Sequence, residues 1–282
     1  MDLSGISANV FRYKYKNGVP FYLSPMSDFH LFNPATNEKR IIRQLDEAKS
    51  LGSRILLNGD IIDGIMPSDM KRYVPSVIPQ EAAGRDDLIN ATIEYVFKFL
   101  SPYAENIDEM ADGNHESAIL KHHHVDIIDI VVEKLNAEHG TDIKRGKYLG
   151  WITYLLGYDL KDNQLSSVRR YTIFRSHGRT RTAEVTKGIM EFSRLRNDRV
   201  NLQWLGHSHD VTLHPEVKFG TNNSGMADYS NMWNLRTGGY LQHSKGSYPA
   251  SMGLLPKPHT AALIQLNPSS NRQSMEARYT LW

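Results

Sequence analysis

Cysteine is absent from the 282-residue sequence, and its absence excludes two kinds of structure. A chain without cysteine forms no disulfide bond and no thiolate zinc site. Because disulfides are typical of oxidising compartments, their absence favours a cytoplasmic protein.

Long hydrophobic runs are absent as well. No stretch of about 18 apolar residues occurs, so the sequence predicts no transmembrane helix and no membrane partner. The first residues, MDLSGISANVFRYKYKNGVPF, lack the apolar core of a secretory signal, so we expect none. A hydrophobic fraction of 40% and a charged fraction of 23% are ordinary for a globular protein, and the length fits one domain over residues 1–282.

An overall excess of one charge is also missing, since the formal net charge is only +2. The charge is unevenly placed, because residues 169–199 hold nine Lys or Arg and three Asp or Glu. Arg175, Arg179 and Arg181 flank His177 within this stretch. Clustered cations attract phosphate backbones, so residues 169–199 make nucleic acid a potential partner. A solvated helix face is the alternative explanation of the same charges.

Five short blocks of polar residues recur along the chain in a fixed order. They are Asp28-x-His30, Gly59-Asp60, Gly113-Asn114-His115-Glu116, His177-Gly178 and Gly206-His207-x-His209. Carboxylate, amide and imidazole groups hold hard or borderline divalent ions. Two such ions side by side activate a water for attack on phosphorus. The blocks therefore predict a dinuclear centre for phosphoester hydrolysis.

The series of blocks resembles the signature of the calcineurin-like metallophosphoesterases. That signature reads D-x-H, GD, GNH-[DE], a lone H and GH-x-H, and this chain has SDFH, NGDIID, DGNHE, SHG and LGHSH in the same order. The resemblance covers roughly two-thirds of the chain, from Asp28 to His209. It implies an α/β fold in which two mixed sheets and outer helices form a four-layer α-β-β-α sandwich.

The resemblance also implies a role for each matching residue. The two metals would be held by Asp28, His30 and His209 on one side and by Asn114, His177 and His207 on the other. Asp60 would bridge them, and His115 would be the catalytic residue that helps the leaving oxygen depart. Two divalent ions are the expected cofactors, Mn²⁺ first because the ligand set is oxygen-rich, with Fe, Zn or Ni also compatible.

Other polar residues near the blocks have two readings each. Asp63 and Glu116 could orient nearby imidazoles as hydrogen-bond acceptors, or could be an ordinary loop acid and an ordinary acid of a helix N-terminus. The tract His122-His123-His124 is better explained as a solvated helix segment than as a metal site. Tyr240 and His243 lie in a late loop that could contact substrate.

Hydrophobic periodicity predicts alternating strands and helices. We expect helices at residues 37–51, 87–100, 117–137 and 182–196, strands at 21–23, 54–57, 106–110, 148–156, 171–175 and 201–205, and a closing hairpin at 261–282. Each block follows a predicted strand, and ligands of open α/β sheets gather at the carboxyl ends of strands. Residues 64–84 and 214–234 show no regular pattern and are expected to be loop insertions, the first of which would overhang the site and shape substrate choice.

Three functions are compatible with these features. The first is a phosphodiesterase or nuclease, the second a phosphomonoesterase acting on small molecules or nucleotides, and the third a non-catalytic scaffold on the same fold. The phosphoserine/threonine phosphatases of the family carry Arg after GD and within the GNH block, whereas GDIIDGI and GNHES contain none. The family's DNA-repair nucleases match better in their ligands, but this chain shows no appended DNA-binding or coiled-coil segment. The natural substrate and the oligomeric state stay open.

Overall fold

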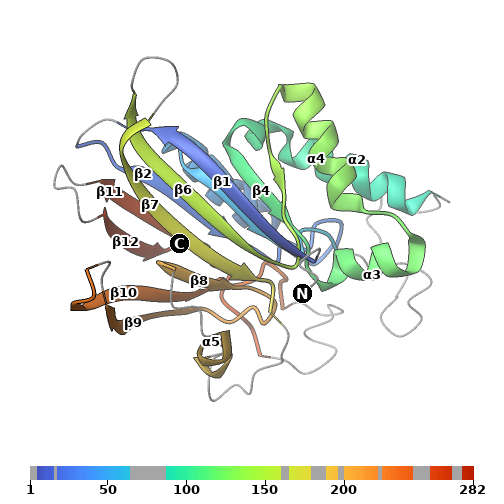
Figure 1. Cartoon of the computed structure of the whole chain (residues 1–282). Helices are drawn as coiled ribbons and strands as arrows, with labels where there is room; N and C mark the ends of the chain where they lie inside the picture. The colour runs from blue at the N-terminus through green and yellow to red at the C-terminus, as the bar shows by residue number, and fades with distance from the viewer. Residues whose placement is uncertain are drawn as a thin grey trace.

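Two six-stranded sheets form the centre of the computed structural model, which describes residues 5–15, 18–63, 87–159, 165–178, 189–195, 200–221, 224–243, 255–268 and 275–282. Both sheets contain parallel and antiparallel pairs (Figure 1). The chain therefore has an α/β fold with two mixed sheets, as the sequence predicts.

The first sheet has the strand order β1-β6-β7-β8-β10-β9. Its strands are β1 (Ile6–Lys14), β6 (Leu149–Asp159), β7 (Leu165–Ser176), β8 (Leu202–Leu205), β10 (Ala227–Arg236) and β9 (Thr212–Thr221). Strands β7, β8 and β10 run parallel, whereas β9 folds back on β10 as an antiparallel hairpin.

The second sheet has the strand order β12-β11-β2-β3-β4-β5. Its strands are β12 (Met275–Leu281), β11 (Ala262–Pro268), β2 (Phe21–Met26), β3 (Arg54–Asn58), β4 (Ile107–Ala111) and β5 (Lys144–Arg145). Strands β2 to β5 are parallel neighbours, and β11 and β12 form the expected closing hairpin.

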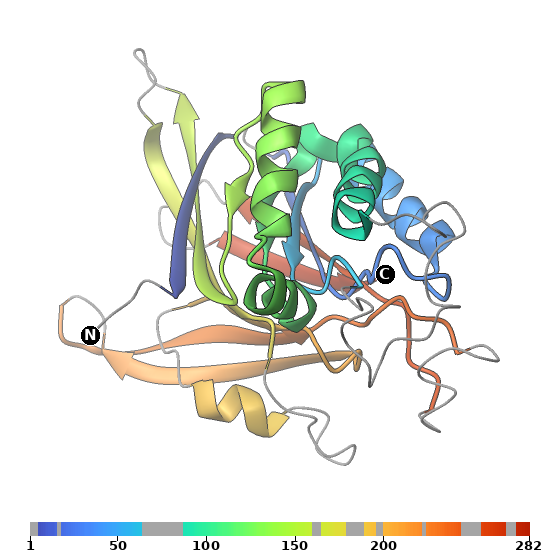
Figure 2. The ribbon, with the colours of Figure 1, turned by 90° about the vertical axis from the view of Figure 1, so that its right-hand side faces the viewer.

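Helices cover one face of the second sheet. They are α1 (Glu38–Ser50), α2 (Leu88–Leu100), η3 (Ser101–Asn106), α3 (Asn114–His123) and α4 (Ile127–His139), and α5 (Ile189–Leu195) lies beside the first sheet. Figure 2 shows α1, α2 and α4 on the side of the second sheet that faces away from the first. None of these helices is long and apolar enough to cross a membrane.

Alternation of side chains along β3 builds two separate cores. Leu56 points between the sheets, where it joins Tyr154 and Trp204, while Leu57 joins the core under the helices with Leu45. All five side chains are at most 1% exposed. Adjacent residues of β3, which face opposite sides of the sheet, thus hold the two sheets together on one side and the helices in place on the other. The four-layer sandwich stays a prediction, since α5 is the single described helix on the outer face of the first sheet.

Two secondary-structure predictions are wrong. The helix expected at 117–137 is split into α3 and α4, because His124 has a left-handed φ of 57° and the Asp126 side chain caps a new helix at Asp129 N–H. The loop expected at 214–234 is instead the hairpin of β9 and β10. The sequence does not indicate these two strands, because most of their residues are exposed on both faces. Such exposure removes the alternation of apolar and polar residues. The insertion expected at 64–84 lies outside the described residues.

Candidate metal centre

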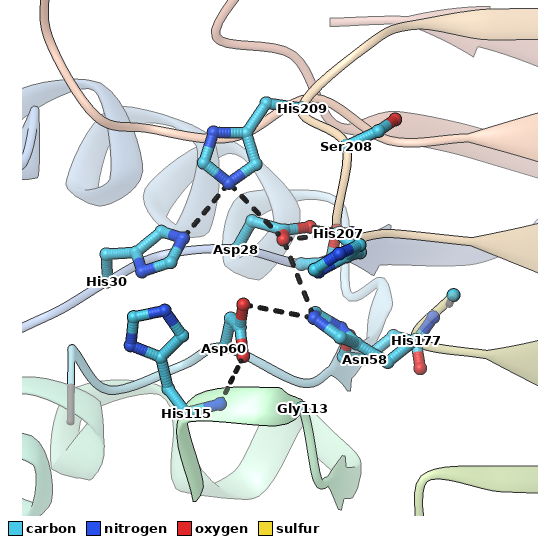
Figure 3. Close-up of polar contacts among 12 residues, drawn as sticks. Asp28, His30, Asn58, Asp60, Gly113, His115, His177, His207, Ser208 and His209 are labelled. Atoms are coloured by element: carbon cyan, nitrogen blue, oxygen red, sulfur yellow. Dashed lines mark hydrogen bonds and ion pairs between the residues drawn. The ribbon is translucent and has the colours of Figure 1, made fainter. Parts of the chain in front are cut away.

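All five blocks lie at the carboxyl ends of strands, as the sequence predicts. Asp28, Asp60 and Asn114 follow the parallel strands β2, β3 and β4 of the second sheet. His177 and His207 follow the parallel strands β7 and β8 of the first sheet. Because parallel neighbours end at the same edge, residues as far apart in sequence as Asp28 and His209 meet at one place. Figure 3 shows the side chains of Asp28, Asp60, His177 and His207 directed toward a common centre.

The backbone at this edge is strained. Seven non-glycine residues of the described chain have a positive φ, and five of them are predicted ligands, namely Asp28, His30, Asp60, His207 and His209. Asp and His tolerate the left-handed region better than most residues, but each such residue still costs on the order of 1–3 kcal/mol. Strain of this kind persists where it serves a function, and here it turns the side chains of several loops toward one point.

Glycines of the blocks let two loops touch. A Cβ added at Gly59, whose φ is +76°, would lie 2.6 Å from the carbonyl oxygen of Asp112. A Cβ added at Gly113 would overlap the backbone nitrogen and the carboxylate of Asp60. Backbone atoms cannot move aside as a flexible side chain can. The glycines of the GD and GNH blocks are therefore required by the contact between the Asp60 loop and the start of α3.

Asp28, His30 and His209 form the first potential ligand group, with one donor atom from each within 4.8 Å of the others. The Nε2 atoms of His30 and His209 are 3.0 Å apart, and His209 Nε2 is 3.5 Å from Asp28 Oδ1. Ligands bound about 2.0–2.1 Å from one ion lie roughly 3.0–3.4 Å from each other. The spacing of this group fits a single metal ion.

Asp60, His177 and His207 form the second potential group, again within 4.8 Å. His177 Nε2 is 3.1 Å from Asp60 Oδ2 and 3.9 Å from Asp28 Oδ1. The other Asp60 oxygen, Oδ1, accepts a hydrogen bond of 3.0 Å from the backbone N–H of His115. Asp60 thus contacts His177 through one carboxylate oxygen and the start of α3 through the other.

Several buried nitrogen and oxygen atoms of the site have no hydrogen-bond partner within the described residues. They include Asn114 Oδ1, His177 Nε2 and His207 Nδ1. His177 Nδ1 lies 2.8 Å from the carbonyl oxygen of Asn58, to which it donates, so Nε2 is the ring nitrogen that faces the site. A buried polar atom without a partner costs about 1–3 kcal/mol. Divalent ions would satisfy these atoms, and the donor set fits them.

The charges of nearby histidines keep the two carboxylates of the site ionised. Burial by itself raises the pKa of Asp60, but the charges of His177 and His115 outweigh it and hold the pKa well below its ordinary value. Burial likewise raises the pKa of Asp28, and the hydrogen bond from His209 together with the charge of His177 lowers it below the usual value. Burial and the nearby charge of His115 lower the pKa of His30 to about 4. Ionised carboxylates and the neutral imidazole of His30 are in the states that metals bind. Burial lowers the pKa of His177, but the charge of Asp60 outweighs it and raises the pKa to about 10, so His177 would release a proton on binding a metal.

His115 is paired with Asp63 beside this centre. Its Nδ1 is 2.9 Å from Asp63 Oδ1, and Asn33 donates a hydrogen bond to the other oxygen of Asp63. Burial lowers the pKa of His115, but the charges of Asp60 and Asp63 outweigh it and raise the pKa to about 9. The raised pKa favours the protonated imidazole, the form that can donate a proton. With His30, the same two residues also lie close enough to form a third potential ligand group.

Asp63 and Glu116 take different roles. Asp63 contacts the imidazole of His115, as one reading of the sequence predicts. Glu116 contacts no imidazole in the hydrogen bonds of the described residues, where it accepts from the backbone N–H groups of Asp60, Ile62 and Gly113 at 3.0, 3.0 and 2.7 Å. Glu116 therefore ties the loop after β3 to the start of α3.

The basic stretch at 169–199 offers fewer free charges than its composition suggests. Arg175 is fully buried and forms an ion pair with Glu109 and a 3.0 Å hydrogen bond to Ser7 Oγ. Arg169 is 8% exposed, whereas Arg170 is exposed. Arg175 thus joins the sheets instead of facing a ligand. Arg179 and Arg181 lie outside the described residues.

The remaining histidine and tyrosine predictions have mixed outcomes. His122 and His124 are exposed at the end of α3, which agrees with a solvated helix segment. Tyr240 is fully buried, so the substrate contact expected there is wrong. Its hydroxyl donates to Gln44, and its backbone N–H donates to the carbonyl oxygen of Asp28 over 3.1 Å. Tyr240 therefore supports a ligand loop from behind.

Three further residues support the ligands and were not identified from the sequence. Thr237 Oγ1 accepts a 3.0 Å hydrogen bond from Trp204 Nε1 and lies 2.6 Å from Ser27 Oγ. The Ser27 hydroxyl in turn donates to the carboxylate of Asp28. A Cβ added at Gly239 would lie 2.5 Å from the His209 ring. No sequence signal links these positions to Asp28 or His209, because only folding brings them together.

Comparisons with known proteins add little. No family model matches the chain, and no curated protein matches it. Among solved structures, a conserved uncharacterised protein from Streptococcus pneumoniae TIGR4, described as a predicted phosphoesterase, is 11% identical, with 92% of this chain and 88% of that chain covered and a TM-score of 0.35. Vps29 from Chaetomium thermophilum is also 11% identical, with coverage of 94% and 98% and a TM-score of 0.30. Likenesses this weak assign neither a family nor an activity.

Proposed function

We propose that this chain is a dinuclear metal-dependent phosphoester hydrolase of the calcineurin-like type, with the four-layer sandwich of that family. The observation that carries the proposal is the meeting of two ligand groups around Asp60, at the ends of strands from both sheets. Five of the ligands have a left-handed backbone there. A folding chain gains nothing from such strain unless the convergent donors bind something.

The proposed ligands divide between two ions. Asp28, His30 and His209 would hold one ion, Asn114, His177 and His207 would hold the other, and Asp60 would contact both, as the two side-chain groups and the unpaired Asn114 oxygen suggest. Bound divalent ions supply Lewis-acid polarisation of the phosphoryl group and a water of lowered pKa. The backbone carbonyl of Asn58 fixes the ring of His177, and the hydroxyl of Ser27 fixes the carboxylate of Asp28. Mn²⁺ is the preferred ion in this proposal because oxygen ligands suit it.

His115 completes the proposed chemistry as a proton donor. Its raised pKa keeps the imidazole protonated at neutral pH, and Asp63 holds the ring from the Nδ1 side. The Nε2–H of the ring is then the group that can donate to the leaving oxygen of the ester. The proposal thus assigns ligand binding to the imidazoles around Asp28 and Asp60, and proton donation to His115.

A phosphodiester is the preferred substrate class in the proposal. A monoester carries a second negative charge that enzymes commonly pair with Arg. The loops after Asp60 and Asn114 contain no Arg at the corresponding places, GDIIDGI and GNHES. Nucleic acid stays a potential partner through Arg170 and the basic residues beyond the described ones, although the burial of Arg175 weakens that argument. The cytoplasmic location expected from the lack of cysteine stays a prediction.

The decisive experiment compares hydrolysis of bis-p-nitrophenyl phosphate and p-nitrophenyl phosphate by metal-stripped protein after addition of Mn²⁺. Metal content is measured in parallel, and Asp60→Asn is the control. Faster diester hydrolysis supports the proposal and makes DNA and RNA the next substrates. Faster monoester hydrolysis would assign a phosphatase instead. Two bound ions with no turnover of either ester would point to an enzyme with a narrow substrate range or to a scaffold.

A further inference from the structure

The β9–β10 hairpin presents exposed apolar side chains that the proposed chemistry does not use. Phe219 is 87% exposed, Tyr229 67% and Val217 51%. Phe219 lies opposite Tyr229 in the register, and Val217 is two residues away, so the three side chains share one face. Toward the base of the hairpin, the same face carries Trp233, whose ring centroid lies 4.6 Å from that of Tyr279. The apolar face thus continues the core between the sheets beyond its edge.

Strand β9 is also an open edge in the part of the chain that the structure describes. Trp233 donates its N–H to the carbonyl oxygen of Asn201, over 2.9 Å and away from β9, so Trp233 and its neighbour Pro215 form a non-hydrogen-bonded pair. It follows that Pro215, Val217 and Phe219 direct their backbone polar groups outward. Proline at this position costs the hairpin no hydrogen bond. Such an edge can pair with another strand through the N–H and C=O groups of Val217 and Phe219 and through the carbonyl of Pro215, which has no N–H to donate.

We propose that two copies of this chain associate through β9, antiparallel about a two-fold axis at Val217. In this register Val217 faces Val217 of the second copy, Phe219 faces Pro215, and Glu216 faces Lys218. The N–H and C=O groups that Val217 directs outward bond to their counterparts across the axis. The two first sheets become one continuous sheet, and the apolar residues of both copies lie on the same side of it.

Charge complementarity selects this partner and this register. Glu216 and Lys218 lie on the face opposite Val217, 2.9 Å apart within one copy. In the proposed pair each Glu216 meets a Lys218 of the second copy, whereas a two-fold axis at Phe219 would place Lys218 opposite Gly220 and lose both contacts. Residues 212–235 contain one Lys, no Arg and two acidic residues. That balance disfavours a nucleic acid or an anionic membrane as the occupant.

The proposed interface leaves the metal centre open. Strands β8 and β10 are parallel, and His207 and His209 follow the carboxyl end of β8. The N-terminal half of β10, with Tyr229, and the C-terminal half of β9, with Phe219, therefore lie at the far end of the hairpin. In Figure 1 the two strands form the lower left margin of the molecule. Association and hydrolysis can thus be measured independently.

Sedimentation velocity of the full chain over about 1–100 µM tests the proposal. The wild type should sediment at twice its 32.1 kDa mass at the higher concentrations. Lys218→Glu and Glu216→Lys each place like charges opposite one another at two symmetric points, which should raise the dimer dissociation constant about tenfold or more. The double variant Glu216→Lys/Lys218→Glu restores opposite charges and should restore the dimer. Arg43→Glu, an equal charge reversal on the exposed face of α1, is the matched control.

A wild type that stays monomeric over the whole range would overturn the proposal. A dimer that both single reversals leave intact would place the interface elsewhere. Failure of the double variant to recover the dimer, with circular dichroism and melting temperature unchanged, would reject the register. Phe219→Ser provides a check that involves no charge, since it should weaken the dimer without altering the circular dichroism of the monomer.

Discussion

The ligand loops and the β9–β10 hairpin are both rich in polar residues, yet they differ in how their environment constrains them. Asp28, Asp60 and His177 are at most 2% exposed, in short loops with tight contacts on every side. Val217 and Phe219 are more than half exposed, on long strands with few neighbours. Substitutions should therefore be severe in the first region and mild in the second, unless a second copy covers the hairpin.

The largest effect is expected for Asp60→Asn. The amide keeps the shape of the side chain but removes the charge and one anionic oxygen, so both ions lose a ligand. Hydrolysis should fall by more than about 100-fold, beyond the loss typical of residues that only orient ligands. Metal analysis of the purified variant should give fewer bound ions than in the wild type. Full activity in this variant would exclude Asp60 as the bridge.

Replacement of His115 separates chemistry from metal binding. His115→Ala should lower kcat by roughly 10²–10⁴ because the proton donor is lost. The bound metal should be unchanged, because the two ligand groups around Asp28 and Asp60 are intact. Steady-state kinetics and metal analysis on the same preparation measure both quantities. Loss of metal in parallel with activity would instead assign His115 to the third ligand group with His30 and Asp63.

The same small substitution in the two regions sharpens the comparison. Gly113→Ala forces a Cβ into the backbone of Asp60, so it should cost about 1–3 kcal/mol of unfolding free energy and reduce metal binding. Urea unfolding of the metal-stripped protein measures the first effect, and metal titration measures the second. Wild-type stability together with wild-type metal affinity would show that the Asp60 loop and the start of α3 do not touch as described.

Gly220→Ala is the matched change in the hairpin and should have the smallest effect. A Cβ at Gly220 meets no atom within 4 Å, and the backbone there is not left-handed. Alanine at a compatible site also narrows the unfolded ensemble, so unfolding free energy should stay unchanged or rise by up to about 1 kcal/mol. The same urea experiment measures it. A clear loss of unfolding free energy would show that Gly220 is needed for the conformation or contacts of the hairpin, despite its exposure.

Much of this contrast was visible in the sequence, and part of it was not. The sequence predicts strands that end shortly before Asp28, Asp60, Asn114, His177 and His207, and these are confirmed, because buried strands carry a strong apolar signal. The hairpin was predicted to be a loop, because residues such as His214 and Ser230 lack the alternation that burial imposes. The break between α3 and α4 was also missed, since a single left-handed residue at His124 leaves the apolar spacing almost unchanged.

The sequence by itself determined the ligand types, their order and their place after strands, because each of these depends on residues adjacent in the chain. Only the tertiary structure decided which side chains share a group, that Glu116 binds backbone N–H groups, and that Arg175 is buried with Glu109. It also placed Thr237 and Gly239 behind Asp28 and His209. These relations depend on distances between segments far apart in sequence, which the packing of the two sheets fixes and local composition does not record.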